Sequence, residues 1–247
     1  MLEEEWKFEE TNLKIKSDSE KGIKSSIKAS LKARQKIERL IIDNPEFRTS
    51  LEPVSLKQNS LPKIIRLMQK ASKIVGIGPF AAVAGSISQV AAEAGKKSGA
   101  NEIIVDNGGD ITIIGNQEYH VGIYAGDSEV SGRFALSIKP NDLPIGICTS
   151  SNSVGHSINF GEADAVVIVA EETSIADAAA TKIANQVKGN DIELSIKNGL
   201  EKAEGTQKVR GCLIARNEQI GVTGKLPEII NLKSRKEKRD QVTQVKT

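Results

Sequence analysis

The residues between positions 145 and 187 include the side chains best suited to bind a metal ion. Asp177 and Thr181 lie four residues apart in an alanine-rich segment that is predicted to be helical. A spacing of four places the carboxylate and the hydroxyl on the same helix face. Both are hard oxygen donors, which Mg²⁺ accepts together with phosphate oxygens and water. The spacing therefore favours a magnesium site.

The same residues also have a purely structural explanation. Ser174 and Asp177 match a capping box, in which an acid at the third helical position bonds to the backbone of the cap. Thr181 could likewise hydrogen-bond back to the carbonyl of Asp177. The glycine- and serine-rich loops elsewhere in the chain, which have no evident structural role, favour the metal site.

A second candidate is the sequence Asn-Gly-Gly-Asp at residues 107–110. Asn and Gly are typical of hairpin turns with positive φ, so the pattern predicts a turn between two strands. Gly108 and Gly109 would also let backbone N–H groups approach a phosphate or ribose, with Asp110 beside them. Turn chemistry alone accounts for the pattern, and ligand binding is the alternative.

A third candidate is the loop of small and hydroxyl-bearing residues at 148–156. Thr149, Ser150 and Ser151 are suited to line the site of an anionic ligand. Cys148 and His156, eight positions apart, are the candidates for a nucleophile and its base. The loop carries no charge to lower the pKa of the thiol and no acid to orient the imidazole. A ligand-lining loop is therefore favoured over a catalytic thiol.

Residues 76–81 match the G-x-G-x-x-A form of a dinucleotide-binding turn, and Asp106 follows at the end of a predicted strand. The segment before Gly76 has helical periodicity, however, whereas the dinucleotide motif follows a strand. A hairpin comes after Asp106, where the motif requires a crossover helix. We interpret this match as false and keep nicotinamide oxidoreduction as a distant rival.

These candidates are spread along an alternation of predicted helices and short strands, typical of an α+β fold. Two of the helices are rich in small residues, and each neighbours a group of strands, which suggests an internal duplication. We expect one domain at 1–232 and a mobile basic tail at 233–247. Helices are predicted at 21–43, 61–75, 79–97, from about 174, and at 191–204, and strands at 6–15, 102–106, 111–115, 119–124, 132–138, 145–148, 163–170, 210–215 and 219–222.

Composition excludes several classes of protein. The 34 Lys and Arg nearly balance 32 Asp and Glu, and aromatic residues make up 3%, which disfavours nucleic-acid binding. The chain shows no signal peptide and no apolar run of about 18 residues, so we expect no membrane association. The two cysteines define no disulfide framework. A cytoplasmic protein is expected.

Seven short strings together resemble the ApbE superfamily, whose members transfer FMN from FAD to protein, and more closely an ApbE-like family of prokaryotic proteins. The resemblance extends from about Trp6 to Leu232. The strings are NPEF, GPFAAVAG, VDNGGDI, GICTSS, VGHS, FGEADAV and IADAAAT.

The resemblance implies two similar α+β halves, with mixed or antiparallel sheets and small-residue helices flanking a central cleft. It implies that Asp177 and Thr181 bind Mg²⁺. It also implies that the turn at 108–110 and the loop at 149–151 lie near a flavin nucleotide, FAD or FMN.

The chain departs from the flavin transferases at two places. They have a lysine-glycine motif before the first small-residue helix, where this chain has residues 76–80 without lysine. Their loop after the histidine is longer and carries an acid where this chain has Asn159. The leading hypothesis is a protein that binds a small phosphorylated ligand, with a flavin nucleotide as a candidate, through Mg²⁺. The alternatives are a non-catalytic scaffold or binding protein, and a sulfur-assimilation protein that uses Cys148.

Overall fold

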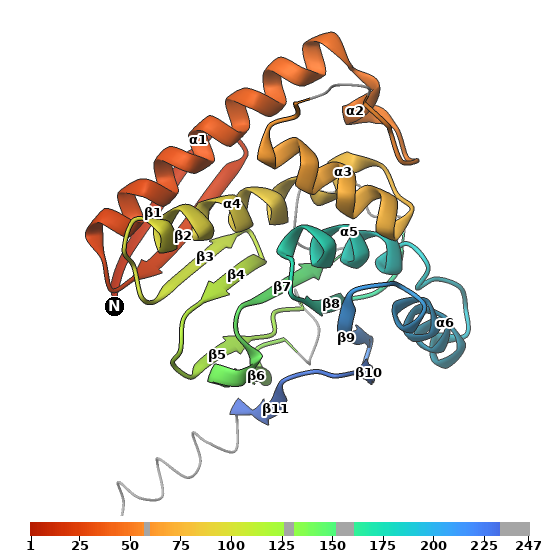
Figure 1. Cartoon of the computed structure of the whole chain (residues 1–247). Helices are drawn as coiled ribbons and strands as arrows, with labels where there is room; N and C mark the ends of the chain where they lie inside the picture. The colour runs from red at the N-terminus through yellow and green to blue at the C-terminus, as the bar shows by residue number, and fades with distance from the viewer. Residues whose placement is uncertain (57–59, 126–130, 152–160, 233–247) are drawn as a thin grey trace, which may run out of the picture.

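The computed structural model describes residues 1–56, 60–125, 131–151 and 161–232, and its largest element is an eight-stranded sheet (Figure 1). The strand order is β1-β2-β3-β4-β7-β8-β9-β10, and each neighbouring pair is antiparallel. The bounds are β1 (Leu2–Phe8), β2 (Thr11–Ser17), β3 (Ile103–Asn107), β4 (Asp110–Ile114), β7 (Ile145–Ser150), β8 (Ala165–Ala170), β9 (Val209–Arg216) and β10 (Gln219–Gly224).

Helices cover one face of this sheet (Figure 1). The helix α4 packs on β3 and β4, and α5 packs on β7 and β8, so each small-residue helix has its own group of strands. The longest helix, α1, packs along α4, and α3 packs on α4 and α5. The bounds are α1 (Glu20–Asp43), α2 (Glu46–Thr49), α3 (Lys63–Val75), the 3₁₀ helix η1 (Pro79–Ala82), α4 (Val83–Lys97), α5 (Thr173–Ala184) and α6 (Ile192–Glu204).

A smaller antiparallel sheet covers the opposite face, with the order β11-β6-β5. Its strands are β5 (Tyr119–Gly122), β6 (Phe134–Ile138) and β11 (Glu228–Asn231), and the 3₁₀ helix η2 (Pro140–Asp142) follows β6. One hydrophobic core fills the space between the large sheet and the helices, and a second core fills the space between the two sheets. The strand β8 is buried on both faces because it contributes to both cores, as its uninterrupted apolar sequence predicts.

The predicted α+β fold with antiparallel sheets is confirmed. The predicted helix at 21–43 is α1, capped by Ser19, whose hydroxyl accepts a hydrogen bond from the N–H of Gly22. The single strand predicted at 6–15 is wrong, because the chain turns at Glu9, which has a φ of 51°, and forms the β1–β2 hairpin. The strand β11 was not predicted.

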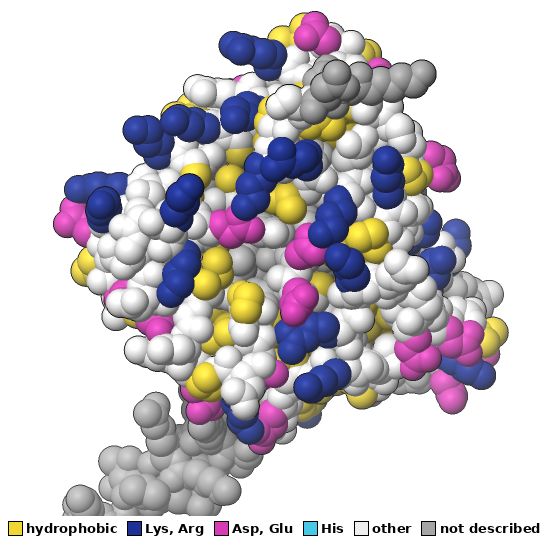
Figure 2. Space-filling model, in the orientation of Figure 1, with side chains coloured by type: hydrophobic (Ala, Val, Ile, Leu, Met, Phe, Trp, Pro, Cys, Tyr) yellow, Lys and Arg dark blue, Asp and Glu magenta, His cyan; other side chains and the backbone are white. Residues whose placement is uncertain are grey.

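Within the described ranges, no single helix is long and apolar enough to cross a membrane. The pair formed by α3 and the continuous stretch η1–α4 passes the same test of length and composition, with a bend of 112° between its two parts. On the face seen in Figure 2, basic side chains are interspersed with acidic and apolar ones over the helices, in keeping with the near-neutral composition.

Candidate functional site

Asp177 lies in the second turn of α5 and is 8% exposed. Its Oδ2 accepts a hydrogen bond of 2.7 Å from the N–H of Gly85, the third residue of α4. The first N–H groups of a helix have no partner within the helix and favour a negative charge. Asp177 therefore caps the N-terminus of a neighbouring helix.

The capping-box explanation of Asp177 is wrong. The helix α5 begins after Glu172, so Ser174 is its second residue and not its cap. The N–H of Ser174 donates to Oε1 of Gln89 from α4, and its buried hydroxyl has no hydrogen-bond partner among the residues that the structure describes. The start of α5 is thus held by α4, as the start of α4 is held by Asp177.

Thr181 lies one turn after Asp177 and is also 8% exposed. In the described part of the chain its hydroxyl makes no hydrogen bond, so back-bonding to the carbonyl of Asp177 does not account for this residue. The carboxylate of Asp177 and the hydroxyl of Thr181 therefore lie one turn apart on one face of α5. Their binding of Mg²⁺ stays a prediction.

The turn at residues 107–110 adopts the predicted hairpin geometry. Gly108 and Gly109 have φ values of 69° and 102°, which favour glycine at both positions. The N–H of Gly109 donates to Oδ1 of Asp106 at 2.8 Å, so this amide is already used within the turn. Among the described residues, no atom lies within 4 Å of a Cβ built on Gly108.

The sheet brings this turn next to the hydroxyl-rich loop. Asp110 on β4 is the register partner of Cys148 on β7, and the N–H of Thr149 donates to the carbonyl of Gly109 at 3.2 Å. Ser150 ends β7 and is buried, and Ser151 follows it at the end of a described range. The proposed ligand-binding residues of the two motifs are therefore neighbours.

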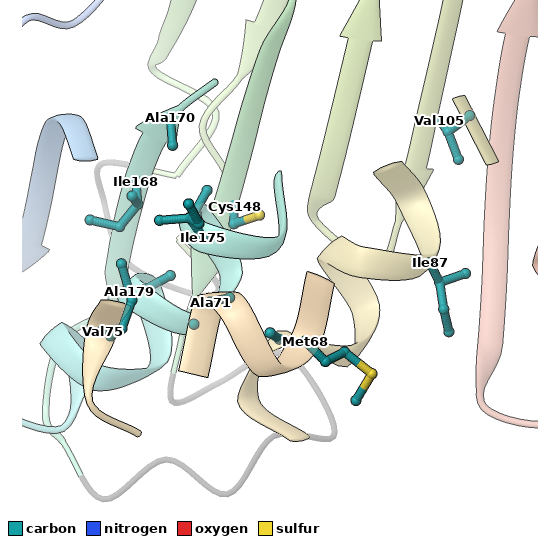
Figure 3. Close-up of a cluster of buried hydrophobic side chains, with 14 of the residues drawn as sticks. Met68, Ala71, Val75, Ile87, Val105, Cys148, Ile168, Ala170, Ile175 and Ala179 are labelled. Atoms are coloured by element: carbon teal, nitrogen blue, oxygen red, sulfur yellow. The ribbon is translucent and has the colours of Figure 1, made fainter. Parts of the chain in front are cut away.

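Cys148 is fully buried on the helix-facing side of the sheet, beside Ile168 and Ile175 (Figure 3). Burial, with added contributions from the charges of Asp110 and Asp177, raises the pKa of the Cys148 thiol well above its usual value. A neutral, enclosed thiol is a poor nucleophile. The structure thus disfavours a catalytic Cys148, and its predicted partner His156 lies outside the described residues.

The charges of two carboxylates, Asp110 and Asp177, act on this thiol, which donates a hydrogen bond to the carbonyl of Thr173 at 3.4 Å. Burial raises the pKa of Asp110 to about 7, a hydrogen bond with Cys148 opposes the rise, and the charge of Asp106 adds to it. Burial also raises the pKa of Asp177, the charge of Asp110 adds to the rise, and the backbone N–H groups of Gly85 and Ala84 oppose it. A carboxylate whose charge is disfavoured both by burial and by a second carboxylate favours a bound proton or a nearby cation.

The donor set fits Mg²⁺ better than a metal that needs an all-protein cage. In the described residues no group of three or more His, Cys, Asp or Glu side chains is placed to hold a metal ion. Magnesium is commonly held by one or two carboxylates, with phosphate oxygens and water completing the shell. Asp177 and Thr181 match that requirement.

The glycines of the dinucleotide-like sequence at residues 76–81 have structural roles. Gly76 ends α3 in the left-handed conformation with a φ of 72°. A Cβ on Gly78 would lie 1.8 Å from the carbonyl oxygen of Ser50, so this glycine allows two backbone segments to cross. The preceding element is the helix α3 and not a strand, which confirms that the match is false.

Sequence reasoning missed two residues that contact this site. Gly85 was assigned only to a small-residue helix, and Asn107 only to a turn. The side-chain amide of Asn107 donates to the carbonyl of Ala84 at 3.1 Å. For Gly85 the available signal was its place near the start of a predicted helix, because a glycine there allows a neighbouring segment to approach closely.

A family model described as "AbpE bacteria" matches residues 3–204. The chain belongs to the AbpE bacteria family. The UPF0280 protein MJ1526 of Methanocaldococcus jannaschii is 40% identical over 230 residues, covering 92% of this chain and 93% of that protein. A UPF0280 protein of Methanothermobacter thermautotrophicus is 43% identical over 198 residues, covering 80% and 76%.

Solved structures share the AbpE fold at low sequence identity. A histidine mutant of the flavin transferase ApbE from Vibrio cholerae superposes with a TM-score of 0.55 at 10% identity, covering 90% of this chain and 96% of that one. The apo form of the flavinyl transferase ApbE from Pseudomonas stutzeri gives 0.51 at 11% identity, covering 90% and 94%. The predicted ApbE-like fold is confirmed.

Proposed function

We propose that this protein binds a phosphorylated ligand together with Mg²⁺, and that Asp177 and Thr181 hold the metal. The observation that carries the proposal is that Asp110, the register partner of Cys148, and Asp177, which accepts from Gly85, carry charges that disfavour one another beside the glycine turn. A divalent cation would relieve the repulsion between the two carboxylates. The turn and the start of the loop at 149–151 would then face the phosphate groups.

A flavin nucleotide is the first ligand to consider. The structural neighbours are titled flavin transferases, and the fold is shared over 90% of this chain. Bound Mg²⁺ would supply charge neutralisation at the phosphates. The residues of this chain would fix the metal with a carboxylate and a hydroxyl and would keep one side of it dry, because Cys148 and the core of α5 close that side.

The test is calorimetric titration of FAD, FMN and ADP, each with and without Mg²⁺. We expect Mg²⁺-dependent binding by the wild type and a loss of about tenfold or more in affinity for Asp177→Asn, since tenfold corresponds to about 1.4 kcal/mol. Asparagine keeps an oxygen that can accept from Gly85, so this variant retains the cap of α4 and removes the charge.

Two variants of Thr181 complete the design. Thr181→Val removes the hydroxyl at nearly constant shape and should weaken Mg²⁺-dependent binding, whereas Thr181→Ser keeps the oxygen and should bind like the wild type. Absence of binding by the wild type, or equal Mg²⁺-dependent binding by the wild type and Asp177→Asn, would contradict the proposed function.

The second candidate is a binding or scaffold protein without catalysis. The segment at 76–80 lacks the lysine found in the transferases, and the only lysine bonded to it in the described residues is Lys182, whose ammonium donates to the carbonyl of Gly76 at the end of α3. The position of the Lys182 ammonium is explained by the unpaired carbonyls at the C-terminus of α3, which attract a positive charge. Release of AMP from FAD that depends on Mg²⁺ would exclude this candidate, and saturated binding without AMP release would support it.

A further inference from the structure

Asn107, the last residue of β3, joins the glycine turn to the start of α4. It is 7% exposed, and its Nδ2 donates to the carbonyl oxygen of Ala84 at 3.1 Å. The contact links residues 23 positions apart in the chain. Neither a hairpin turn nor a strand end requires a side chain that reaches into a neighbouring helix.

The peptide group that Asn107 contacts also holds Asp177. The carbonyl of Ala84 and the N–H of Gly85 belong to one planar peptide unit, so they point in opposite directions. The N–H donates to Oδ2 of Asp177 at 2.7 Å. This peptide is therefore fixed by Asn107 at its oxygen and by Asp177 at its nitrogen.

Packing leaves the peptide little freedom. A Cβ on Gly85 would lie 2.6 Å from the carbonyl oxygen of Thr173 and 2.7 Å from Cβ of Asp177, so the backbone of α4 is in direct contact with α5. A hydrogen bond at a carbonyl also polarises its peptide and strengthens the N–H as a donor. The side chain of Asn107 thereby influences both the direction and the strength of the bond to Asp177.

We propose that Asn107 is a positioning residue that couples the ligand turn to the metal-binding carboxylate of Asp177. The proposal rests on the proposed function, in which Asp177 binds Mg²⁺. Asn107 directly precedes Gly108 and Gly109, so a phosphate at the turn and a metal at Asp177 act on opposite ends of one hydrogen-bonded path. Binding of each should strengthen binding of the other.

The experiment titrates Mg²⁺ into the protein with and without saturating ADP. In the wild type, ADP should tighten Mg²⁺ binding about fivefold or more. Asn107→Ala removes the support of the peptide that holds Asp177, so it should weaken Mg²⁺ binding by up to about tenfold and should clearly reduce the effect of ADP. Asn107→Ser, whose hydroxyl is a donor, should restore part of the coupling.

The control is Asn44→Ala. The amide of Asn44 also donates to a main-chain carbonyl, that of Leu40 at 3.2 Å, but at the end of α1. Both variants lose one such bond, so a merely structural role for Asn107 predicts lower melting temperatures in both and unchanged coupling in both.

The outcomes separate the two proposals. If the wild type shows no Mg²⁺-dependent ADP binding, two proposals are refuted: the binding of ADP together with Mg²⁺, and the coupling through Asn107. If the wild type binds Mg²⁺ and ADP with coupling, and Asn107→Ala keeps that coupling, the role of Asn107 alone is refuted. Loss of coupling in Asn107→Ala with coupling intact in Asn44→Ala supports it.

Discussion

The side chains around Cys148 illustrate how a buried polar group can have a structural and a chemical role at once. Asp177 caps α4, and this structural role alone could explain its presence, since a helix cap stabilises the folded protein by about 1 kcal/mol. A cap, however, does not need a second carboxylate beside it. Asp110 adds that carboxylate at a position where burial disfavours its charge, as is common at functional sites.

The raised pKa of Asp110 predicts a specific pH dependence of stability. Its pKa rises from 3.8 to about 7 in the folded protein because of burial, so between these values the native state holds a proton that the unfolded chain releases. The free energy of unfolding should therefore fall as pH rises from about 4 to about 7, by at most about 1.4 kcal/mol per pH unit. Without added metal, urea denaturation at pH 5 and pH 7 should show a smaller fall for Asp110→Asn than for the wild type.

Asp43→Asn is the control for this measurement, because Asp43 is exposed at the end of α1. It should show the same fall in stability between pH 5 and pH 7 as the wild type. An equal fall in Asp110→Asn would mean that Asp110 is ionised in the folded protein at pH 5, and the electrostatic account of the site would be wrong.

At the scale of elements, the site depends on how closely α5 approaches its neighbours. Gly85 brings α4 against α5, and Gly146 does the same for β7. A Cβ on Gly146 would lie 2.5 Å from Cα and 2.7 Å from N of Thr173, which are backbone atoms at the start of α5. Without a side chain at these two positions, Asp177 can reach both the N-terminus of α4 and the surroundings of Cys148.

Gly146→Ala should therefore be strongly destabilising. The added methyl group would force the backbone of α5 away from β7, and overpacking of this kind costs about 1 to 3 kcal/mol. Gly122→Ala is the matched control, since a Cβ there would meet no described atom within 4 Å, and it should change stability by less than about 0.5 kcal/mol. Urea unfolding of the two variants checks the difference, and equal stabilities would contradict the close packing of α5.

The elements with strong local signals were the ones that the sequence predicted. The helix α1 has regular apolar spacing and a serine cap, and its predicted bounds differ from the observed ones by one residue. The turn at Glu9 was missed because a glutamate gives no signal for positive φ. The strand β11 was missed because its four residues are ordered by pairing with β6, about ninety positions earlier.

The candidate site divides in the same way. The residue types and the spacing of Asp177 and Thr181 could be predicted, because a helix repeat fixes their relation. The cap on Gly85 could not, because it joins residues 92 positions apart and depends on the packing of two helices. The same is true of Asn107 and Ala84, whose contact exists only once β3 and α4 are stacked.

At the scale of the whole molecule, the large sheet separates two regions with different roles. The candidate site lies on the helix-covered face, where β3, β4 and β7 approach α4 and α5. The second core lies on the other face under β5, β6 and β11. Stability of the second core should therefore be separable from ligand binding at the first.

Removal of residues 226–247 tests this separation. The deletion takes away Leu226, which packs over Gly211, and β11, which pairs with β6, so the apolar underside of the sheet becomes exposed. We expect a loss of about 2 to 4 kcal/mol in the free energy of unfolding and stronger binding of a dye that reports exposed apolar surface. Removal of residues 233–247 alone, which the sequence predicts to be mobile, should change neither the free energy of unfolding nor the binding of the dye.

Below its melting temperature, the protein that lacks residues 226–247 should still bind Mg²⁺ and ADP like the wild type, because the sheet shields Asp177 and Thr181 from the lost segment. A parallel loss of ligand affinity and stability would show that the two faces are one cooperative unit.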